Sequence, residues 1–415
     1  MPGPSTKPDR KSSSADRRGF LKLGVTSLAG ALTACQNASG PPEDVAASRL
    51  GAPLSPYGER SAFEKSVRHV PTTRTPEAGS TRAPLQDSYG IITPSSLHFE
   101  RHHSGVPAIN PAQHRLLIHG MVERPLTLTL EEVKRLPSVT RVHFVECAGN
   151  GRSEWGPKTA PDAQQSHGLA SCSEWTGVLL SELLAEVGVQ PQATWILAEG
   201  ADVCHMQRSV PLSKAMDDII VAYGQNGEAI RPEQGYPLRL IVPGWEGNIN
   251  VKWLRRLKLA SQPHMTRDET SKYTDLMADG TARLFTYEMD AKSIITFPSG
   301  GHHLAAPGLY EISGLAWSGR GLIQRVEISA DSGQTWQDAQ LQEPRHRMAF
   351  TRFRLPWRWD GAEAVLVSRC TDSTGYVQPA LEALVAVRGM NSDYHNNCRK
   401  AWRISAAGSV TNVDA

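Results

Sequence analysis

The sequence predicts an α+β protein with two folded domains, a mixed domain of strands and short helices followed by an all-β sandwich. Two patterns support this division. Strand-like and helix-like segments alternate over residues 86–284, whereas residues 285–405 show short alternating strands separated by turn signals, at the roughly 8–12-residue spacing typical of β-sandwiches. The third observation is size, because 415 residues, of which 40% are hydrophobic, are sufficient for about two or three domains with full cores.

Local signals predict the first elements of the mixed domain. Thr129 and Glu132 have the spacing of a capping box and begin a short helix that ends at Pro137. Residues 141–145 form the next predicted strand. A second helix is predicted where apolar residues recur at helical spacing before Gly188. These apolar residues are Leu179, Leu180, Leu183, Leu184 and Val187.

The later elements are predicted mainly as strands. Residues 219–223 form one strand, which Asn226 and Gly227 follow as a hairpin turn. Residues 238–242 form a fully apolar strand. In the sandwich, the clearest strands and the turn between them are residues 308–312, 325–328, 331–333 (the turn) and 364–368.

The chain begins with a segment that predicts an address and not a fold element. DRRGFLK (residues 16–22) resembles a twin-arginine export signal, and the apolar stretch after it is too short to span ~30 Å of hydrocarbon as a helix. We therefore expect residues 1–40 to direct export to the periplasm by a route that carries folded, cofactor-loaded proteins. LTAC, ending at Cys35, also fits a lipoprotein cleavage site and leaves a lipid anchor open. Residues 41–85 are predicted as an extended arm and residues 406–415 as a tail.

Charge and cysteine spacing exclude several classes of protein. Residues 1–35 carry six of the 44 Lys and Arg and two of the 42 Asp and Glu, so the rest of the chain is nearly neutral and nothing indicates binding to nucleic acid. The six cysteines show no C-x-x-C pairing, no haem-attachment motif and no zinc-like spacing. His98, His102 and His103 cluster, but no cysteine or acid stands at a supporting interval for zinc.

Cys147 is the residue with the most chemical potential. It follows a predicted strand, and Ala148, Gly149 and Gly151 allow a ligand or backbone to approach it closely. Arg152 is near enough in sequence to help hold the sulfur as a thiolate, which is a soft ligand suited to a transition metal. On spacing alone, an inert buried cysteine remains the alternative.

The segment ECAGNGRSE (residues 146–154) resembles the signature of the sulfite oxidase family of molybdenum enzymes. The resemblance implies that Cys147 ligates molybdenum beside the dithiolene of molybdopterin. FERHH (residues 99–103), EGAD (199–202), GYPLR (235–239) and VKWL (251–254) match further family segments in family order. The similarity extends over about residues 90–405, and it implies that the sandwich is an immunoglobulin-like domain through which the protein forms a homodimer.

The resemblance assigns roles to individual residues. It implies that the cofactor is bound by His103, Cys147, Asp202, Arg239 and Lys252. It implies that the catalytic pocket is formed by Arg101, Arg152, Trp175 and Tyr273, with the arginines attracting an anionic substrate. Several of these residues have a structural alternative. Arg239 and Lys252 could be solvated surface cations, His103 a surface histidine, Asp202 an ordinary turn residue and Trp175 part of the core.

The chain departs from the family pattern in several places. Gln234 stands where the family often has a cofactor-binding histidine, and Gly151 stands where animal members have an arginine. No cytochrome b5-like haem domain precedes the molybdenum domain, and we expect no haem in this chain. A pocket arginine is expected near the C-terminus, and Arg399 and Arg403 are both candidates.

Three segments narrow the resemblance within the family. Residues 51–61, 371–379 and 391–397 look most like the molybdenum subunit of bacterial sulfane (sulfite) dehydrogenases of the Sox thiosulfate-oxidising system. This implies oxidation of sulfite or protein-bound sulfane sulfur, single-electron transfer to a c-type cytochrome partner, and contact with a sulfur-carrier protein. A periplasmic methionine-sulfoxide-type molybdenum reductase is the alternative enzyme, although such reductases resemble only the first domain. A binding protein that kept the fold without catalysis is the other alternative.

Overall fold

The computed structural model describes residues 53–72, 75–277, 279–390 and 392–414. The chain forms two compact units, Met1–Glu64 and Lys65–Ala415, and every helix and strand described lies in the second. The predicted export signal and Cys35 lie outside the described residues. Within the described ranges, no helix is both long enough and apolar enough to cross a membrane.

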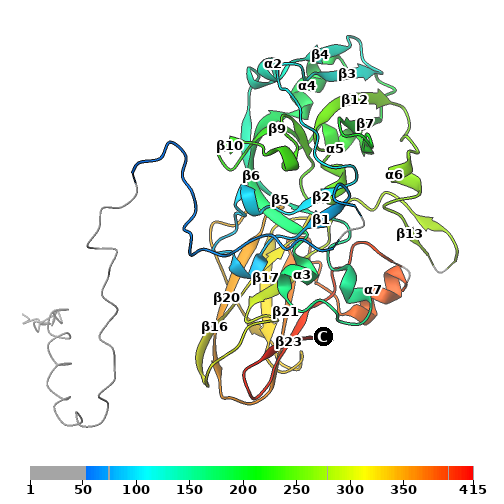
Figure 1. The fold of residues 1–415 in the computed structure, drawn as a ribbon. Coiled ribbons are helices and arrows are strands. Elements are labelled where there is room, and N and C mark those ends of the chain that lie inside the picture. The colour runs from blue at the N-terminus through cyan, green and yellow to red at the C-terminus, as the bar shows by residue number, and fades with distance from the viewer. Residues whose placement is uncertain (1–52, 73–74, 278, 391, 415) are drawn as a thin grey trace, which may run out of the picture. The chain divides into compact units, whose positions relative to one another are not determined.

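The mixed domain contains two five-stranded sheets (Figure 1). The first has the order β10-β9-β6-β5, with β11 paired to β9, and is antiparallel throughout. Its strands are Val139–Glu146 (β5), Ala170–Leu179 (β6), Ile220–Gln225 (β9), Glu228–Ala229 (β10) and Arg239–Ile241 (β11). The second has the order β4-β3-β12-β7-β8, and only β3 and β12 pair in parallel. Its strands are Leu116–Gly120 (β3), Leu126–Leu128 (β4), Trp195–Gly200 (β7), Gln207–Pro211 (β8) and Leu254–Ala260 (β12).

The helices are short and lie between the strands. The α-helices are Leu130–Lys134 (α2), Ala163–His167 (α3), Leu180–Val187 (α4), Leu212–Ala215 (α5), Arg267–Thr270 (α6) and Leu381–Arg388 (α7). The 3₁₀ helices are Leu85–Asp87 (η1), Ser95–Leu97 (η2), Arg152–Trp155 (η3), Pro232–Gln234 (η4) and Gly247–Ile249 (η5).

The local sequence signals predict the helix and turn positions correctly. Thr129 Oγ1 accepts a hydrogen bond from the Glu132 N–H at 3.2 Å, and Glu132 Oε2 accepts one from the Thr129 N–H at 2.8 Å, which completes the capping box. Helix α4 ends before Gly188 as predicted, although Leu179 ends strand β6 and does not belong to the helix. Asn226 and Gly227 both have positive φ, at 51° and 78°, as a tight hairpin between β9 and β10 requires.

Two small sheets complete the mixed domain. Strand β1 (Gly79–Thr81) pairs with β2 (Glu100–His102), and β13 (Asp275–Leu276) pairs with β14 (Ala282–Arg283). Strand β1 lies within residues 41–85, so the end of the predicted extended arm is part of a sheet. It is held there because Ser80 pairs with Arg101 across the two strands.

The second domain is a sandwich of two antiparallel sheets, as predicted (Figure 1). One has the order β15-β16-β20-β19, with strands Lys292–Phe297 (β15), Gly308–Trp317 (β16), Gln340–Leu341 (β19) and Thr351–Trp359 (β20). The other has the order β18-β17-β21-β22-β23, with strands Ile323–Ser329 (β17), Gln337–Asp338 (β18), Ala364–Asp372 (β21), Ala401–Ile404 (β22) and Val410–Val413 (β23).

The prediction of a tail over residues 406–415 is wrong. Gly408, with φ of 81°, lets the chain reverse after β22, and β23 then pairs along the whole of β22. Val410 is buried in the sandwich core. The last strand therefore covers the edge of β22 and becomes the terminal strand of this sheet.

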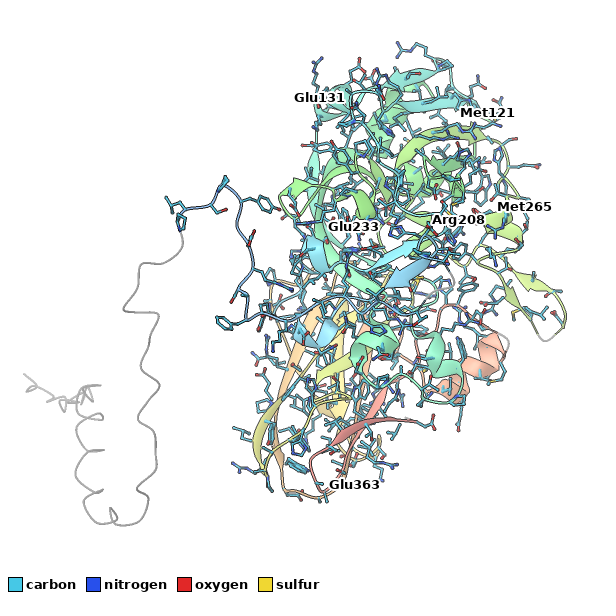
Figure 2. The ribbon with its side chains drawn as sticks, in the orientation of Figure 1. Met121, Glu131, Arg208, Glu233, Met265 and Glu363 are labelled. Carbon is cyan, nitrogen blue, oxygen red and sulfur yellow. The ribbon has the colours of Figure 1, made fainter. Side chains whose placement is uncertain are left out.

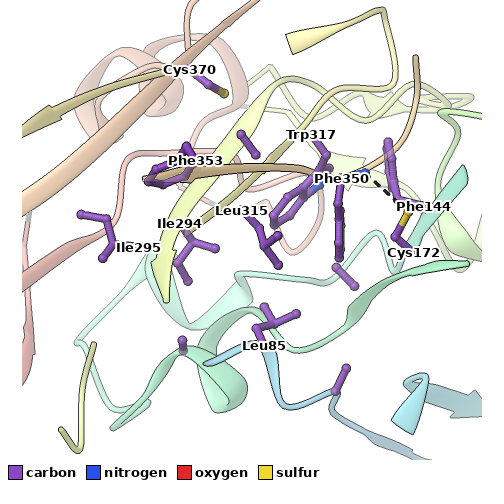
Figure 3. Close-up of a cluster of buried hydrophobic side chains, with 14 of the residues drawn as sticks. Leu85, Phe144, Cys172, Ile294, Ile295, Leu315, Trp317, Phe350, Phe353 and Cys370 are labelled. Carbon is purple, nitrogen blue, oxygen red and sulfur yellow. Dashed lines mark hydrogen bonds between the residues drawn. The ribbon is translucent and has the colours of Figure 1, made fainter. Parts of the chain in front are cut away.

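A single hydrophobic core joins the two domains (Figure 3). Phe144 of β5 stacks on Phe350 with ring centroids 6.4 Å apart and an interplanar angle of 10°. The Phe350 ring lies against Trp317 of β16, and the Phe350 N–H points to the sulfur of Cys172 at 3.5 Å. Since β5 also leads into Cys147, the sandwich packs directly against the strand that positions the candidate metal ligand.

Candidate active site

An open cavity lies in the mixed domain. Segments far apart in the chain meet around it, because strands of both large sheets and the β2 strand end there. Seven of the nine predicted site residues line this cavity, namely Arg101, His103, Cys147, Asp202, Arg239, Lys252 and Tyr273. Trp175 and Arg152 do not line it.

Cys147 is held by backbone hydrogen bonds on both sides. Its N–H donates to the Leu169 carbonyl at 2.9 Å, and its carbonyl accepts from the Asn150 N–H at 2.9 Å. A Cβ at Gly247 would lie 3.2 Å from the Cys147 Cα, so only glycine allows η5 to pack this closely. Burial raises the pKa of the thiol. Formation of a thiolate here therefore calls for a strong local cation, and a coordinated metal ion provides one.

His103 and Tyr273 form a neutral hydrogen-bonded pair on the cavity wall. The His103 Nε2 and the Tyr273 hydroxyl are 2.9 Å apart. Burial first, and Arg101 second, lower the pKa of His103 to about 4, while burial raises the pKa of Tyr273. The guanidinium of Arg208 lies 5.2 Å from the centre of the Tyr273 ring. At neutral pH the pair can exchange hydrogen bonds with a ligand without carrying charge.

Three cations line the cavity without an ion pair to a carboxylate in the described part of the chain, namely Arg101, Arg239 and Lys252. Lys252 Nζ donates to the carbonyls of Arg101 and Glu233 at 3.2 and 3.0 Å, and lies 2.8 Å from His102 Nδ1. Arg239 donates to the carbonyls of Gln234 and Asn250 at 3.0 and 3.3 Å. Burial lowers the pKa of Lys252 strongly and that of Arg239 to about 9. Since buried positive charge is costly without an anion, the set fits an anionic ligand.

Unpartnered polar atoms support the same conclusion. The Nε of Arg239 and the Nε2 of His98 belong to residues that line the cavity, and both atoms are buried with no hydrogen-bond partner within the described ranges. A thiol, uncompensated cations and free hydrogen-bonding atoms are the donor set that a phosphate-bearing pterin with a thiolate-bound metal needs. The residues present therefore fit the predicted cofactor.

Trp175 and Arg152, the two predicted site residues that do not line the cavity, lie elsewhere in the fold. Trp175 is 0% exposed, its Nε1 donates to the His143 carbonyl at 3.2 Å, and its ring supports the Arg239 guanidinium from behind at 5.0 Å. The side chain of Arg152 is 68% exposed and pairs with Asp393 at 2.9 Å, because Gly151, with φ of 79°, turns the chain into η3 and away from the cavity. The structure therefore does not place the side chain of either residue on the cavity wall, where the resemblance predicted them.

Neither candidate for the C-terminal pocket arginine reaches the cavity. Arg399 lies over the Trp336 ring at 5.4 Å, and Arg403 is half-exposed beside Glu363 at 3.8 Å. Gln234 does line the cavity, but its Nε2 donates to the Phe99 carbonyl at 2.9 Å.

Comparisons with known proteins agree with this site. Residues 103–267 match the oxidoreductase molybdopterin binding domain, and residues 283–400 match the Mo-co oxidoreductase dimerisation domain. Sulfite oxidase of Gallus gallus is 30% identical over 314 residues, which cover 70% of this chain and 68% of that protein. The chain belongs to the sulfite oxidase family of molybdenum enzymes.

Two further relatives show the range of this sulfite oxidase family. The crystal structure of the sulfane dehydrogenase SoxCD from Paracoccus pantotrophus contains a chain that is 46% identical, with a TM-score of 0.87, covering 89% of this chain and 96% of that one. An NADH nitrate reductase of Ulva prolifera is 32% identical over 290 residues, which cover 60% of this chain and 32% of the relative. The chain spans from about a third to two thirds of the length of the first curated relatives it matches.

In this family member, a buried network that the sequence did not reveal supports the site. Arg208 (labelled in Figure 2) pairs with Glu246 at 2.9 Å and Glu269 at 3.0 Å. Glu246 lies 3.2 Å from the Nε2 of His395, and the backbone N–H of His395 donates to the Ala148 carbonyl at 2.8 Å. The segment after α7 thus braces the loop of Cys147. No sequence signal could have found these contacts, because the partners of the side-chain contacts alone lie 38 to 149 residues apart.

Proposed function

We propose that this protein oxidises sulfite, or sulfane sulfur carried on a partner protein, at a molybdenum cofactor held by Cys147. The electrons leave one at a time to a c-type cytochrome. The observation that carries the proposal is the meeting of the Cys147 thiol with three uncompensated cations at one cavity in a sulfite oxidase family member.

Different side chains would bind different parts of the cofactor. Cys147 would supply the thiolate to the metal, while Arg239 and Lys252 would offset the charge of the pterin phosphate. His103 and Asp202 would hydrogen-bond the pterin from the same wall. When bound, the molybdenum cofactor supplies the two-electron redox chemistry, and the protein supplies position and field.

Arg101 and Tyr273 would act on the substrate. Arg101 is a cation on the cavity wall, so it attracts an anionic sulfur compound and stabilises charge that develops as the compound is oxidised. In the tautomer whose Nε2 carries the proton, His103 donates to the Tyr273 oxygen. The hydroxyl proton of Tyr273 is then free to hydrogen-bond a group in the cavity.

Partners and location belong to the same proposal. The match to a dimerisation domain over residues 283–400 supports a homodimer through the sandwich. The likeness to a chain of the sulfane dehydrogenase SoxCD supports a sulfane substrate. The carrier protein and the separate cytochrome are the partners that the resemblance of residues 51–61, 371–379 and 391–397 implies. DRRGFLK (residues 16–22) supports export to the periplasm by the twin-arginine route, and Cys35 would be the site of any lipid anchor.

Steady-state turnover tests the function. Protein produced in a host that makes molybdopterin is assayed for cytochrome c reduction with sulfite, and separately with a carrier protein bearing sulfane sulfur. Parallel assays follow reduction of methionine sulfoxide and of nitrate by a reduced dye. We expect turnover with one or both sulfur donors and a Mo(V) paramagnetic signal on partial reduction. Turnover only in the reductase assays, or protein without molybdenum, would overturn the proposal.

A further inference from the structure

His98 is a polar side chain on the cavity wall that none of the roles above uses. Its side chain is 1% exposed, and its Nε2 has no partner among the described residues. Its Nδ1 lies 3.1 Å from the Phe99 carbonyl oxygen. Because a carbonyl oxygen can only accept, Nδ1 carries the proton of the neutral ring, and Nε2 is a bare acceptor on a residue that lines the cavity.

The charge state and the orientation of the ring are both fixed. Burial, and then the nearby Arg239, lower the pKa of His98 to about 3, so the ring is neutral at neutral pH. The Phe99 ring stacks on it with centroids 5.3 Å apart, and the Trp175 ring meets it edge-on at 5.9 Å. The same Trp175 ring supports Arg239 at 5.0 Å. Trp175 therefore aligns two cavity residues from behind, although it does not line the cavity itself.

The neighbouring glutamine cannot provide the missing acceptor. Gln234 donates its Nε2 to the Phe99 carbonyl at 2.9 Å, and its Oε1 lies 3.4 Å from Arg239 Nη1. Both ends of this amide are engaged within the protein. Among the described residues that line the cavity, His98 Nε2 and Asn248 Oδ1 are buried acceptors without a partner, and His98 is the one that lies beside Arg239.

We propose that His98 is a cofactor-binding residue, whose Nε2 accepts a hydrogen bond from an N–H group of the pterin ring system. Pterins carry N–H donors along the edge of a flat bicyclic ring, and an imidazole acceptor held in a fixed plane matches such an edge. His98 thus takes the position of a recognition residue beside the cations that hold the phosphate. This inference rests on the proposed function, since it assumes a bound molybdopterin.

Cofactor retention tests the proposal without reference to activity. Molybdenum and pterin are measured per chain in purified protein and again after prolonged dialysis, for wild type, His98→Phe and His98→Gln. We expect His98→Phe, which keeps the ring stacking but loses the acceptor, to retain the cofactor roughly three- to tenfold less well, the size of one neutral hydrogen bond. We expect His98→Gln to recover most of the retention through its carbonyl oxygen.

A matched control distinguishes loss of the Nε2 acceptor of His98 from the general effect of replacing a buried histidine. His143 is also a buried histidine of the mixed domain but does not line the cavity, so we expect His143→Phe to retain cofactor like wild type. Circular dichroism and thermal unfolding of the cofactor-free proteins check that the variants fold. Normal retention in a folded His98→Phe protein would overturn the inference and leave the proposed function intact. Wild-type protein that holds no molybdenum or pterin would overturn both.

A measurement on unmodified protein covers the case in which His98→Phe does not fold. Nitrogen NMR of histidine-labelled protein reports the protonation and hydrogen bonding of each ring nitrogen. We expect the Nε2 resonance of His98 to stay that of an unprotonated nitrogen and to shift when the cofactor is bound. A resonance that is identical in cofactor-free and loaded protein would contradict the proposed contact.

Discussion

Lys292 of the sandwich forms a buried ion pair with Glu146, the residue immediately before Cys147. The two side chains are 1% and 0% exposed. Glu146 also accepts hydrogen bonds from Asn150 Nδ2 at 2.9 Å and from Trp317 Nε1 at 2.7 Å. The second domain therefore holds the strand end that presents the candidate metal ligand.

Removal of this ion pair should destabilise the folded chain. We expect Lys292→Met to lower the free energy of unfolding by about 3–5 kcal/mol, because it leaves the carboxylate of Glu146 buried without its cation. Urea denaturation of cofactor-free protein measures the change. A second change, Glu146→Gln, should restore most of the loss. Lys134→Met, which removes an exposed pair with Glu131, should cost less than about 1 kcal/mol. Equal effects of the two lysine variants would contradict the assignment.

Cys147→Ser should separate folding from metal binding. We expect the variant to fold like wild type but to bind less molybdenum and to oxidise sulfite more slowly. Loss of a residue that only hydrogen-bonds a metal ligand costs roughly 10- to 100-fold in metal affinity or activity, and we expect loss of the ligand itself to cost more. Metal analysis and cytochrome c reduction measure the two losses. Cys370→Ala, which removes a buried thiol of the sandwich, is the control and should retain both. A Cys147→Ser protein with near-normal sulfite oxidation would refute the metal-ligand role.

The two arginines predicted for the pocket should behave differently. Arg101 lines the cavity, so we expect Arg101→Gln to lower kcat/KM for sulfite by roughly 10- to 100-fold, the value of a hydrogen bond to a charged group. Arg101→Lys should recover part of this loss because it keeps the charge. Arg152→Gln should change kcat/KM by less than about threefold, because Arg152 is exposed and paired with Asp393. A larger fall in kcat/KM for the Arg152→Gln protein would contradict this and indicate that Arg152 acts on the substrate.

Buried neutral histidines should make the protein sensitive to acid. Burial lowers the pKa of His143 to about 4, whereas a histidine of the unfolded chain titrates near about 6.5. The unfolded state therefore takes up the proton first, so stability is complete above about pH 6.5 and is lost as the pH falls towards 4. From this residue alone we expect a loss of roughly 2–3 kcal/mol between about pH 7 and pH 4.5. Denaturant midpoints of wild type and His143→Phe at both pH values measure it. A difference between the two proteins that does not change with pH would contradict the prediction.

Short-range signals predicted much of the fold correctly. The capping box at Thr129, the turn at Asn226 and Gly227, and the end of α4 at Gly188 all depend on residues within one or two turns of the chain. Strand β23 was missed because its pairing with β22 depends on the reversal at Gly408, which the pattern of alternating residues did not show.

By itself, the sequence determined the family, the thiol that could bind the metal, and seven side chains that the structure brings to one cavity. These are properties of motifs, in which residue type and spacing carry the chemistry. Only the tertiary structure decided that Trp175 supports His98 and Arg239 from behind, that Arg152 points to solvent, and that Lys292 holds Glu146. The physical reason is that burial and charge pairing depend on how sheets pack, and Lys292 and Glu146 lie 146 residues apart.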